Sequence, residues 1–128
     1  MSTEDEVRLA VPATPEYLRL ARVTATGLAS RLGFTYDEVE DLRLAIDELC
    51  FALIGNKGRS GQVSLRYVMI DAGLQIEGLG SFDDTGAAPK LSDLSKQILA
   101  ALVDEYEIGG PDDASAASFR LVKTKGAS

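Results

Sequence analysis

The sequence predicts an α+β fold, a two-layer α/β sandwich in which three helices cover one face of a mixed, mostly antiparallel sheet. Two patterns predict this class. Apolar residues alternate with polar ones in several short segments, as in β-strands, and recur every three or four positions in three longer segments, as in amphipathic helices. These segments follow the order β-α-α-β-β-α-β, and 128 residues suffice for one domain, 1–128, with frayed ends.

The first two elements are a strand and a helix. Residues 6–12 alternate in hydrophobicity and stop at Pro12, which favours a position at a sheet edge. Residues 14–16, Thr-Pro-Glu, then supply an N-cap, a proline at the first helical position and an acid in the first turn. We therefore expect a helix from there to about residues 32–33, where a glycine provides a terminator.

A second helix begins at residues 35–38, Thr-Tyr-Asp-Glu, which match the capping box. Its buried stripe repeats every three or four positions and consists of Val39, Leu42, Ile46, Leu49 and Leu53. The acidic pair Asp47-Glu48 interrupts this apolar run. Glu48 borders two alanines at the edge of the stripe, whereas Asp47 is expected in solvent beside Arg43.

The remaining segments complete the predicted order. They are a loop at 55–61, strands at 62–70 and 74–82 joined by a hairpin, a loop at 81–90, a third helix capped by Ser92, a loop at 107–118 and a strand at 117–125. The end of the last strand is basic, and we expect it to be frayed.

Composition excludes several classes of function. A formal net charge of −7 with scattered Lys and Arg disfavours direct nucleic-acid binding. The absence of histidine removes Ser-His-Asp and Cys-His catalysis, imidazole metal sites and histidine phosphotransfer. The single cysteine, Cys50, permits no intrachain disulfide and fits a small buried residue. No apolar run approaches the roughly 18 residues of a membrane span, and the acidic start is unlike a signal peptide, so we expect a cytoplasmic protein without membrane contact.

Residues 21–50 carry a recognisable pattern, with Ala-Arg-Val-Thr at 21–24 and Ala-Ile-Asp-Glu at 45–48. Together with the order of elements, this pattern resembles the GHKL (histidine kinase and HSP90-like) ATPase superfamily, and within it the small anti-sigma factor serine kinases of bacteria. The resemblance covers nearly the whole chain and implies a sandwich of the Bergerat type. It implies protein partners as well, namely a sigma factor, an anti-sigma antagonist or both. Members of the family are commonly dimers, so a homodimer is compatible with the resemblance.

The resemblance also assigns a role to Glu48. In the N box helix of the family, a glutamate polarises the attacking hydroxyl or water, and an asparagine four residues on holds the magnesium ion. Glu48 falls on the glutamate position, as a vestigial catalytic base. The asparagine position is Ala52, whose methyl group cannot ligate Mg²⁺, so no metal ligand is expected there. Asn56, a further turn along, is too far to substitute.

A second ATP motif of the family, the DxGxG box whose aspartate reads the adenine amino group, is eroded. If the glycines of the Glu-Gly-Leu-Gly run at 77–80 are aligned with this box, the aspartate position is Ile76. If strand length is used instead, the position is about Gly80. A longer strand would bring Asp83 or Asp84, followed by Gly86, into the role. The sequence leaves these alignments open.

The third motif, a Gly-rich loop that cradles phosphates at the start of the third helix, aligns with residues 93–96, which contain no glycine. Asp93 would lie in the first helical turn and repel a phosphate, and Lys90 and Lys96 would offset this only in part. A charge-assisted hydrogen bond of the kind that the family's intact motifs make to a nucleotide is typically worth about 1.5 to 3 kcal/mol. Tight nucleotide binding is therefore not expected.

These observations lead to three hypotheses. The first is an anti-sigma-factor-like regulator of transcription that binds its partner by protein contact, at a surface that includes Arg22, with ATP binding weak or lost and no cofactor required. The alternative is an enzyme, an active MgATP-dependent serine kinase of an anti-sigma antagonist, with Glu48 as base and an aspartate on adenine. In the third, the old nucleotide pocket, narrowed by Ile76 or Phe51, holds another ligand or is filled by side chains.

Overall fold

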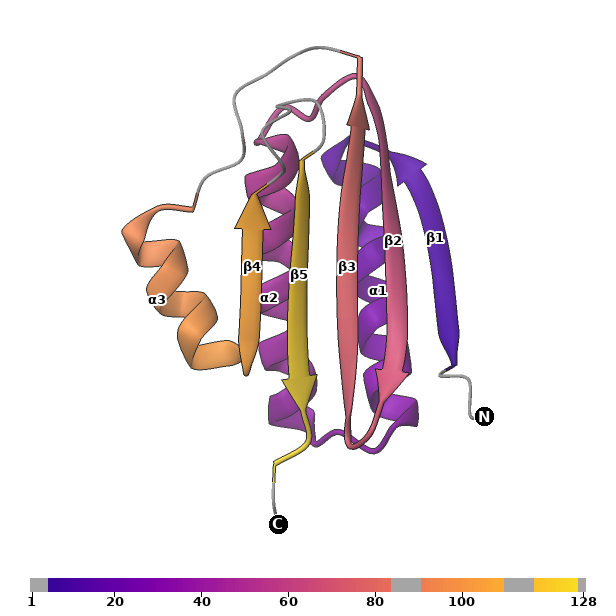
Figure 1. Ribbon diagram of the computed structural model, residues 1–128, viewed down its shortest axis with the longest axis vertical. Helices are drawn as coiled ribbons and strands as arrows, with labels where there is room; N and C mark the ends of the chain where they lie inside the picture. The colour runs from indigo at the N-terminus through magenta and orange to yellow at the C-terminus, as the bar shows by residue number, and fades with distance from the viewer. Residues whose placement is uncertain (1–4, 84–90, 110–116, 127–128) are drawn as a thin grey trace.

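The sheet in the computed structural model has five strands in the order β1-β2-β3-β5-β4, and every neighbouring pair is antiparallel (Figure 1). The structure describes residues 5–83, 91–109 and 117–126. The elements are β1 (Glu6–Pro12), α1 (Pro15–Arg31), α2 (Tyr36–Ile54), β2 (Gly61–Ile70), β3 (Gly73–Phe82), α3 (Asp93–Leu102), β4 (Glu105–Gly109) and β5 (Ser118–Thr124).

The predicted fold class and the predicted order of elements are confirmed, with one strand added. The sequence predicts a loop at 107–118, but the structure pairs β4 with β5 at the sheet edge. The strand is only 5 residues long and ends at Gly109. Glycine and proline follow it directly in the sequence, so its short alternation of Tyr106 and Ile108 was hidden by turn-forming residues.

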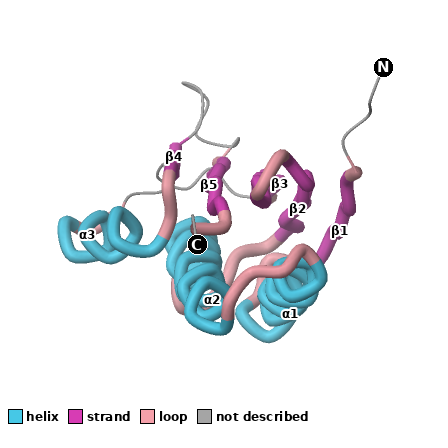
Figure 2. Tube along the Cα trace, turned by 90° about the horizontal axis from the view of Figure 1, so that it is seen from below, coloured by secondary structure: helices cyan, strands magenta, loops and turns pink. Residues whose placement is uncertain are grey.

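Two layers build the molecule. Figure 2 shows α1 and α2 side by side beneath one face of the sheet, with α3 beside α2 and close to the edge strand β4. The core lies between these layers and contains fully buried side chains such as Ile46, Leu49, Ile76 and Leu121. The hydroxyl of Tyr67 donates a hydrogen bond of 2.9 Å to the carbonyl oxygen of α1 residue Ala21. The opposite face of the sheet is not covered by any element that the structure describes (Figure 2).

The helix ends follow the sequence signals in part. The capping box is confirmed, because Thr35 Oγ1 accepts from the Glu38 amide and Glu38 Oε1 accepts from the Thr35 amide. Gly33 has a φ of 89° just beyond α1, as expected of a terminator. Thr14 occupies the N-cap position of α1, but its side chain makes no capping hydrogen bond, contrary to the prediction.

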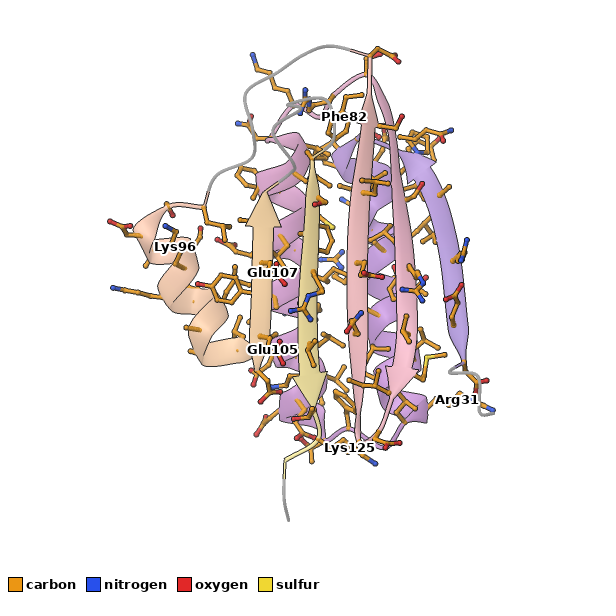
Figure 3. All side chains as sticks on the ribbon, in the orientation of Figure 1. Arg31, Phe82, Lys96, Glu105, Glu107 and Lys125 are labelled. Carbon is orange, nitrogen blue, oxygen red and sulfur yellow. The ribbon has the colours of Figure 1, made fainter. Side chains whose placement is uncertain are left out.

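Residues at and just after the end of β5 form hydrogen bonds with one end of each of the three helices. Lys123 Nζ donates to the Leu102 carbonyl at the end of α3 (2.7 Å), and Lys125 Nζ donates to the Leu32 carbonyl at the end of α1 (3.0 Å). The Gly126 amide donates to the Glu38 carboxylate at the start of α2. The basic end expected to be frayed is therefore bonded to the helical layer as far as Gly126. Lys125 marks this end of the sheet in Figure 3, opposite Phe82.

In the part of the chain that the structure describes, no helix combines the length and the apolar character that crossing a membrane requires.

Candidate functional site

Glu48, the predicted base position, lies on the side of α2 that faces α3. Its carboxylate is half-buried and Glu48 Oε1 accepts a hydrogen bond of 2.6 Å from Ser95 Oγ. Ser95 belongs to the first turn of α3, the segment that the sequence analysis aligned with the phosphate-binding loop of the family. The structure therefore brings together two of the aligned motifs, and a serine hydroxyl lies directly on the carboxylate.

The start of α3 has its own hydrogen-bond chain. Ser92 caps the helix, since its Oγ accepts from the Ser95 amide at 3.0 Å. The same Ser92 hydroxyl donates to Ser95 Oγ, also at 3.0 Å. Asp93 lies in the first turn, where its charge meets the positive end of the helix dipole. The Ser95 amide in the first turn of α3 therefore already has a hydrogen-bond acceptor within the chain.

Ala52, at the expected asparagine position, packs half-buried against the core and offers no oxygen. Among the residues that the structure describes, no group of three Asp, Glu or Cys side chains is arranged to hold a metal ion. Because Mg²⁺ requires oxygen ligands, the Ala52 side chain cannot hold a magnesium ion at this turn of α2.

The glycine run of β3 is covered by aromatic rings on its helix-facing side. Ile76 is fully buried on this side, and Gly78 and Gly80 follow it with the period of a strand. A Cβ atom added to Gly78 would collide with the ring of Phe119, and one added to Gly80 with the ring of Phe82. Two of the positions considered for the adenine-reading aspartate, Ile76 and Gly80, thus lie under or among apolar side chains.

Asp83 ties the end of β3 to the loop after α2. Its Oδ2 accepts a hydrogen bond of 2.6 Å from Ser60 Oγ, and its amide donates to the Ser60 carbonyl at 2.8 Å. The guanidinium of Arg59 lies 4.0 Å from the centre of the Phe82 ring. Asp84 and Gly86, the other residues considered for nucleotide contact, lie outside the described residues, as does Lys90.

Lys96 is exposed on α3 and points away from the sheet (Figure 3). Its backbone carbonyl accepts a hydrogen bond of 3.3 Å from the hydroxyl of Tyr106 in β4.

Arg22 borders a groove between α1 and α2. Its Nη1 lies 3.1 Å from Asp47 Oδ2, and the two side chains are 31% and 42% exposed. The expected pairing of Asp47 with Arg43 is therefore wrong as a hydrogen bond: Arg43 binds Glu40 at 2.6 Å on its own helix, and Asp47 reaches across to α1. The long sequence separation of Arg22 and Asp47 hid this pair from local spacing arguments.

The groove has a volume of about 300 Å³ and is lined by residues of both helices, among them Leu18, Arg19 and Ile54. Phe51 lies here with 58% of its surface exposed, not among the core side chains next to Ile76. Phe51 therefore does not lie beside Ile76, which occupies the helix-facing side of β3. Burial raises the pKa of the neighbouring Cys50 thiol to about 12, which keeps it protonated and unreactive.

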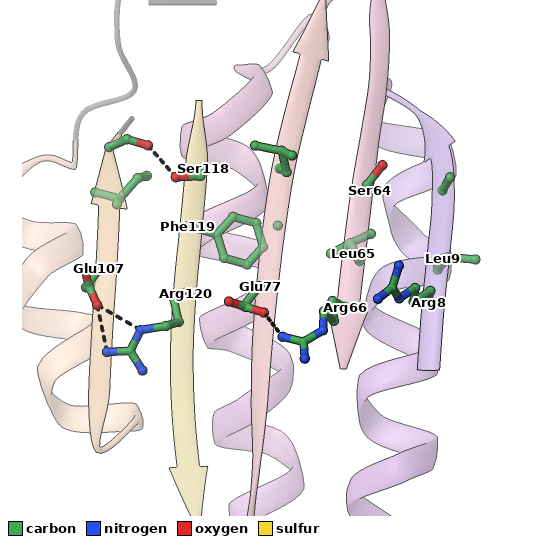
Figure 4. Close-up of a pocket in the computed structure, with 15 residues that line it drawn as sticks. Arg8, Leu9, Ser64, Leu65, Arg66, Glu77, Glu107, Ser118, Phe119 and Arg120 are labelled. Atoms are coloured by element: carbon green, nitrogen blue, oxygen red, sulfur yellow. Dashed lines mark hydrogen bonds and ion pairs between the residues drawn. The ribbon is translucent and has the colours of Figure 1, made fainter. Parts of the chain in front are cut away.

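The uncovered sheet face carries a second feature, which the sequence analysis missed. A row of charged residues crosses all five strands at one level: Arg8, Arg66, Glu77, Arg120 and Glu107. Beside it lies a broad hollow of about 930 Å³ (Figure 4). The signal was available, because outward positions of the predicted strands 62–70 and 74–82 include charged residues of opposite sign.

Ion pairs link this row across neighbouring strands. Arg66 contacts Glu77 at 2.5 Å and Arg120 contacts Glu107 at 2.7 Å (Figure 4). Arg66 also contacts Glu6 at 2.7 Å. The hydrogen bond that Arg66 donates to Glu77, followed by the one to Glu6, raises the pKa of Arg66. The bond that Arg120 donates to Glu107 does the same for the pKa of Arg120. These exposed pairs add little stability individually, but they place charges of both signs on this face.

Comparison with known proteins shows close relatives. The chain is 36% identical over 116 residues to a protein of Bacillus pumilus, which covers 84% of this chain and 70% of the relative. It is 34% identical over 109 residues to one of Bacillus subtilis (83% and 68%) and 34% identical over 114 residues to one of Bacillus velezensis (86% and 71%). All three relatives carry the name serine-protein kinase RsbW. No family model matches the chain.

Proposed function

The chain belongs to the GHKL family of bacterial anti-sigma factor serine kinases, and from this premise we propose that it regulates transcription by capturing a sigma factor or an anti-sigma antagonist through protein contact, without bound nucleotide. It acts in the cytoplasm, where such partners are found. The observation that supports this proposal is that several residues aligned with the family's nucleotide motifs are buried or hydrogen-bonded by the chain's own side chains.

The adenine end of the site supports the proposal. In one of the alignments that the sequence leaves open, the buried Ile76 stands at the position of the base-reading aspartate, and the rings of Phe119 and Phe82 lie over Gly78 and Gly80. Shifting such rings aside for a ligand would require packed core side chains to rearrange, which costs free energy in a densely packed interior.

The phosphate end supports it as well. Ala52 provides no magnesium ligand, and the carboxylate of Glu48 is taken by Ser95. Asp93 puts a negative charge at the helix end where a phosphate would need backbone amides. A triphosphate with no magnesium ion would meet two carboxylates here.

For the partner surface we propose the groove between α1 and α2. Arg22 is held at its rim by Asp47, so the guanidinium is pre-organised while part of it stays exposed. Phe51 adds an exposed aromatic side chain beside it, and both Phe and Arg are enriched in the cores of protein interfaces. We further propose that a second copy of the chain covers the open sheet face, forming a homodimer.

The experiment measures binding of the purified chain to each sigma factor and each candidate antagonist of its host bacterium, with and without MgATP. We expect capture that is unchanged by MgATP. Arg22→Ala should weaken it about tenfold, as expected for the loss of a charge-assisted contact, whereas Arg31→Ala, an exposed arginine at the far end of the same helix, should not. If the folded protein captures none of these partners, the proposal fails.

A second function, an MgATP-dependent serine kinase acting on an antagonist, is favoured by the name that the relatives share. It requires phosphate transfer to a serine of the antagonist that is lost in Glu48→Ala. Repeated absence of transfer with the cognate antagonist present would exclude it.

A further inference from the structure

The contact between Ser95 and Glu48 has the form of a base meeting a substrate hydroxyl. The resemblance gives a glutamate at this position the task of polarising an attacking hydroxyl. In the structure a serine hydroxyl of the chain itself occupies that carboxylate, with Ser95 Oγ 2.6 Å from Glu48 Oε1. This distance is at the short end of hydrogen bonds to an ionised acceptor.

The orientation of the Ser95 hydroxyl is fixed by a third group. Ser92 Oγ donates to Ser95 Oγ, so Ser95 has its own proton to give, and Glu48 receives it. Ser92 Oγ also accepts a hydrogen bond from the Ser95 amide, and by this bond Ser92 caps α3. The three side chains form one directed chain of hydrogen bonds from the start of α3 to α2.

This series of hydrogen bonds is important because few other contacts hold α3 in place. Within the described part of the chain, Leu99 is the only fully buried residue of α3. Elsewhere α3 is held by the bonds of Tyr106 to the Lys96 carbonyl and of Lys123 to the Leu102 carbonyl. Tyr106 and Lys123 belong to β4 and β5, so of these bonds the one between Ser95 and Glu48 is the one that joins α3 directly to α2.

We propose that Ser95 is a positioning residue that occupies the Glu48 carboxylate as an internal stand-in for a substrate hydroxyl, and so keeps α3 closed against α2. Glu48 on α2 is then the acceptor of the Ser95–Glu48 hydrogen bond between the two helices, which we call the latch. This inference goes beyond the proposed function and needs no partner protein, so its failure would leave the capture of partners to be judged separately.

Hydrogen exchange of the α3 backbone amides in the full chain tests the latch. We expect Ser95→Ala and Glu48→Ala each to speed exchange in the first turns of α3 by about fivefold, the ratio expected for one hydrogen bond of typical net strength. The double variant should show no further increase, because both substitutions remove the same bond. Gln97→Ala, on the exposed side of α3, should leave exchange unchanged.

Conservative variants separate the latch from a general structural effect. Ser95→Thr keeps a hydroxyl donor and Glu48→Gln keeps an oxygen acceptor, so both should retain wild-type exchange in α3. Additive effects of the two alanine substitutions, or wild-type protection in Ser95→Ala, would overturn the proposal. If Glu48→Ala does not fold, Ser95→Ala with its threonine rescue decides the question alone.

Discussion

Glu38 and Glu48 lie on the same helix, and each carboxylate accepts a hydrogen bond from a residue far away in the sequence. Glu38 accepts from the amides of Thr35 and Gly126, at the start of α2 and the end of the chain. Glu48 accepts from the hydroxyl of Ser95. The contacts of Glu38 join the start of α2 to the residues after β5, and the contact of Glu48 joins α2 to α3.

Glu38 should make stability depend on pH. The hydrogen bonds from the Thr35 and Gly126 amides hold the pKa of Glu38 below its ordinary value of 4.5. A lowered folded-state pKa means that this stabilisation is complete above the ordinary value and is lost as pH falls through the folded pKa. Glu38→Gln should therefore lower the melting temperature at pH 7, and the gap to the wild type should narrow as the solution is acidified well below pH 4.5.

Thermal unfolding followed by circular dichroism at several pH values measures this gap. Glu16→Gln, which changes an exposed first-turn acid of α1, serves as the matched control for the helix dipole. An equal gap at neutral and acidic pH for Glu38→Gln would contradict the assignment.

Local spacing predicted the residues whose partners are near in sequence. The capping box of α2 and the burial of Cys50 followed from it and are confirmed. The pairs Arg22–Asp47 and Ser60–Asp83 join residues that only the folded chain brings together, so no spacing rule could find them. The placement of Glu48 at the edge of the buried stripe was predictable, but its partner on α3 was not.

Among the elements, α3 depends most on a few polar contacts. Its end is held by Lys123, whose Nζ donates to the Leu102 carbonyl at 2.7 Å and lies 3.4 Å from Asp41 Oδ2. The Lys123 side chain is only 12% exposed, so this bond is shielded from water.

Lys123→Met should lower the free energy of unfolding by about 1 to 3 kcal/mol, because it leaves a shielded carbonyl and a carboxylate without their donor. Lys125→Met removes a similar bond to the Leu32 carbonyl in an exposed setting and should cost less, about 0.5 kcal/mol. Urea unfolding measures both. Equal losses for the two variants would show that Lys123 does not anchor α3.

Strong periodicity made the long elements predictable, but the short strand β4 was not predicted. Both long helices and the hairpin of β2 and β3 were recognisable because each repeats its period several times. β4 offers two inward-facing residues, Tyr106 and Ile108, before glycine begins. A strand of this length is specified by its pairing with β5, which is a tertiary contact.

At the scale of the whole molecule, one face of the sheet is filled by helices and the other is free among the described elements. Its charges of both signs and Leu79, 52% exposed on the middle strand, make it suited to a like face. In a two-fold arrangement, arginines of one copy can lie opposite glutamates of the second copy.

The homodimer proposed for this face gives a direct prediction. Light scattering after size exclusion should report a dimer for the wild type and a monomer for Leu79→Asp, which places a charge at the centre of the face. Leu94→Asp is the matched control, since Leu94 is 65% exposed on α3, and it should remain dimeric. A monomeric wild type, or a dimeric Leu79→Asp, would refute this interface.

The central claim is that this member of a kinase family captures its partner without nucleotide. It rests on three observations: Ile76 is buried, Ala52 offers no oxygen to a metal ion, and Ser95 Oγ donates a hydrogen bond to the Glu48 carboxylate. The most direct measurement is a calorimetric titration of the purified chain with ATP, with and without magnesium, beside Glu48→Ala and Ala52→Asn. We expect no binding heat from the wild type or from Glu48→Ala at micromolar concentrations, and none from Ala52→Asn, because the aromatic rings and Ser95 remain in place. Micromolar binding by the wild type that depends on magnesium would contradict the claim and return Glu48 to the role of a catalytic base.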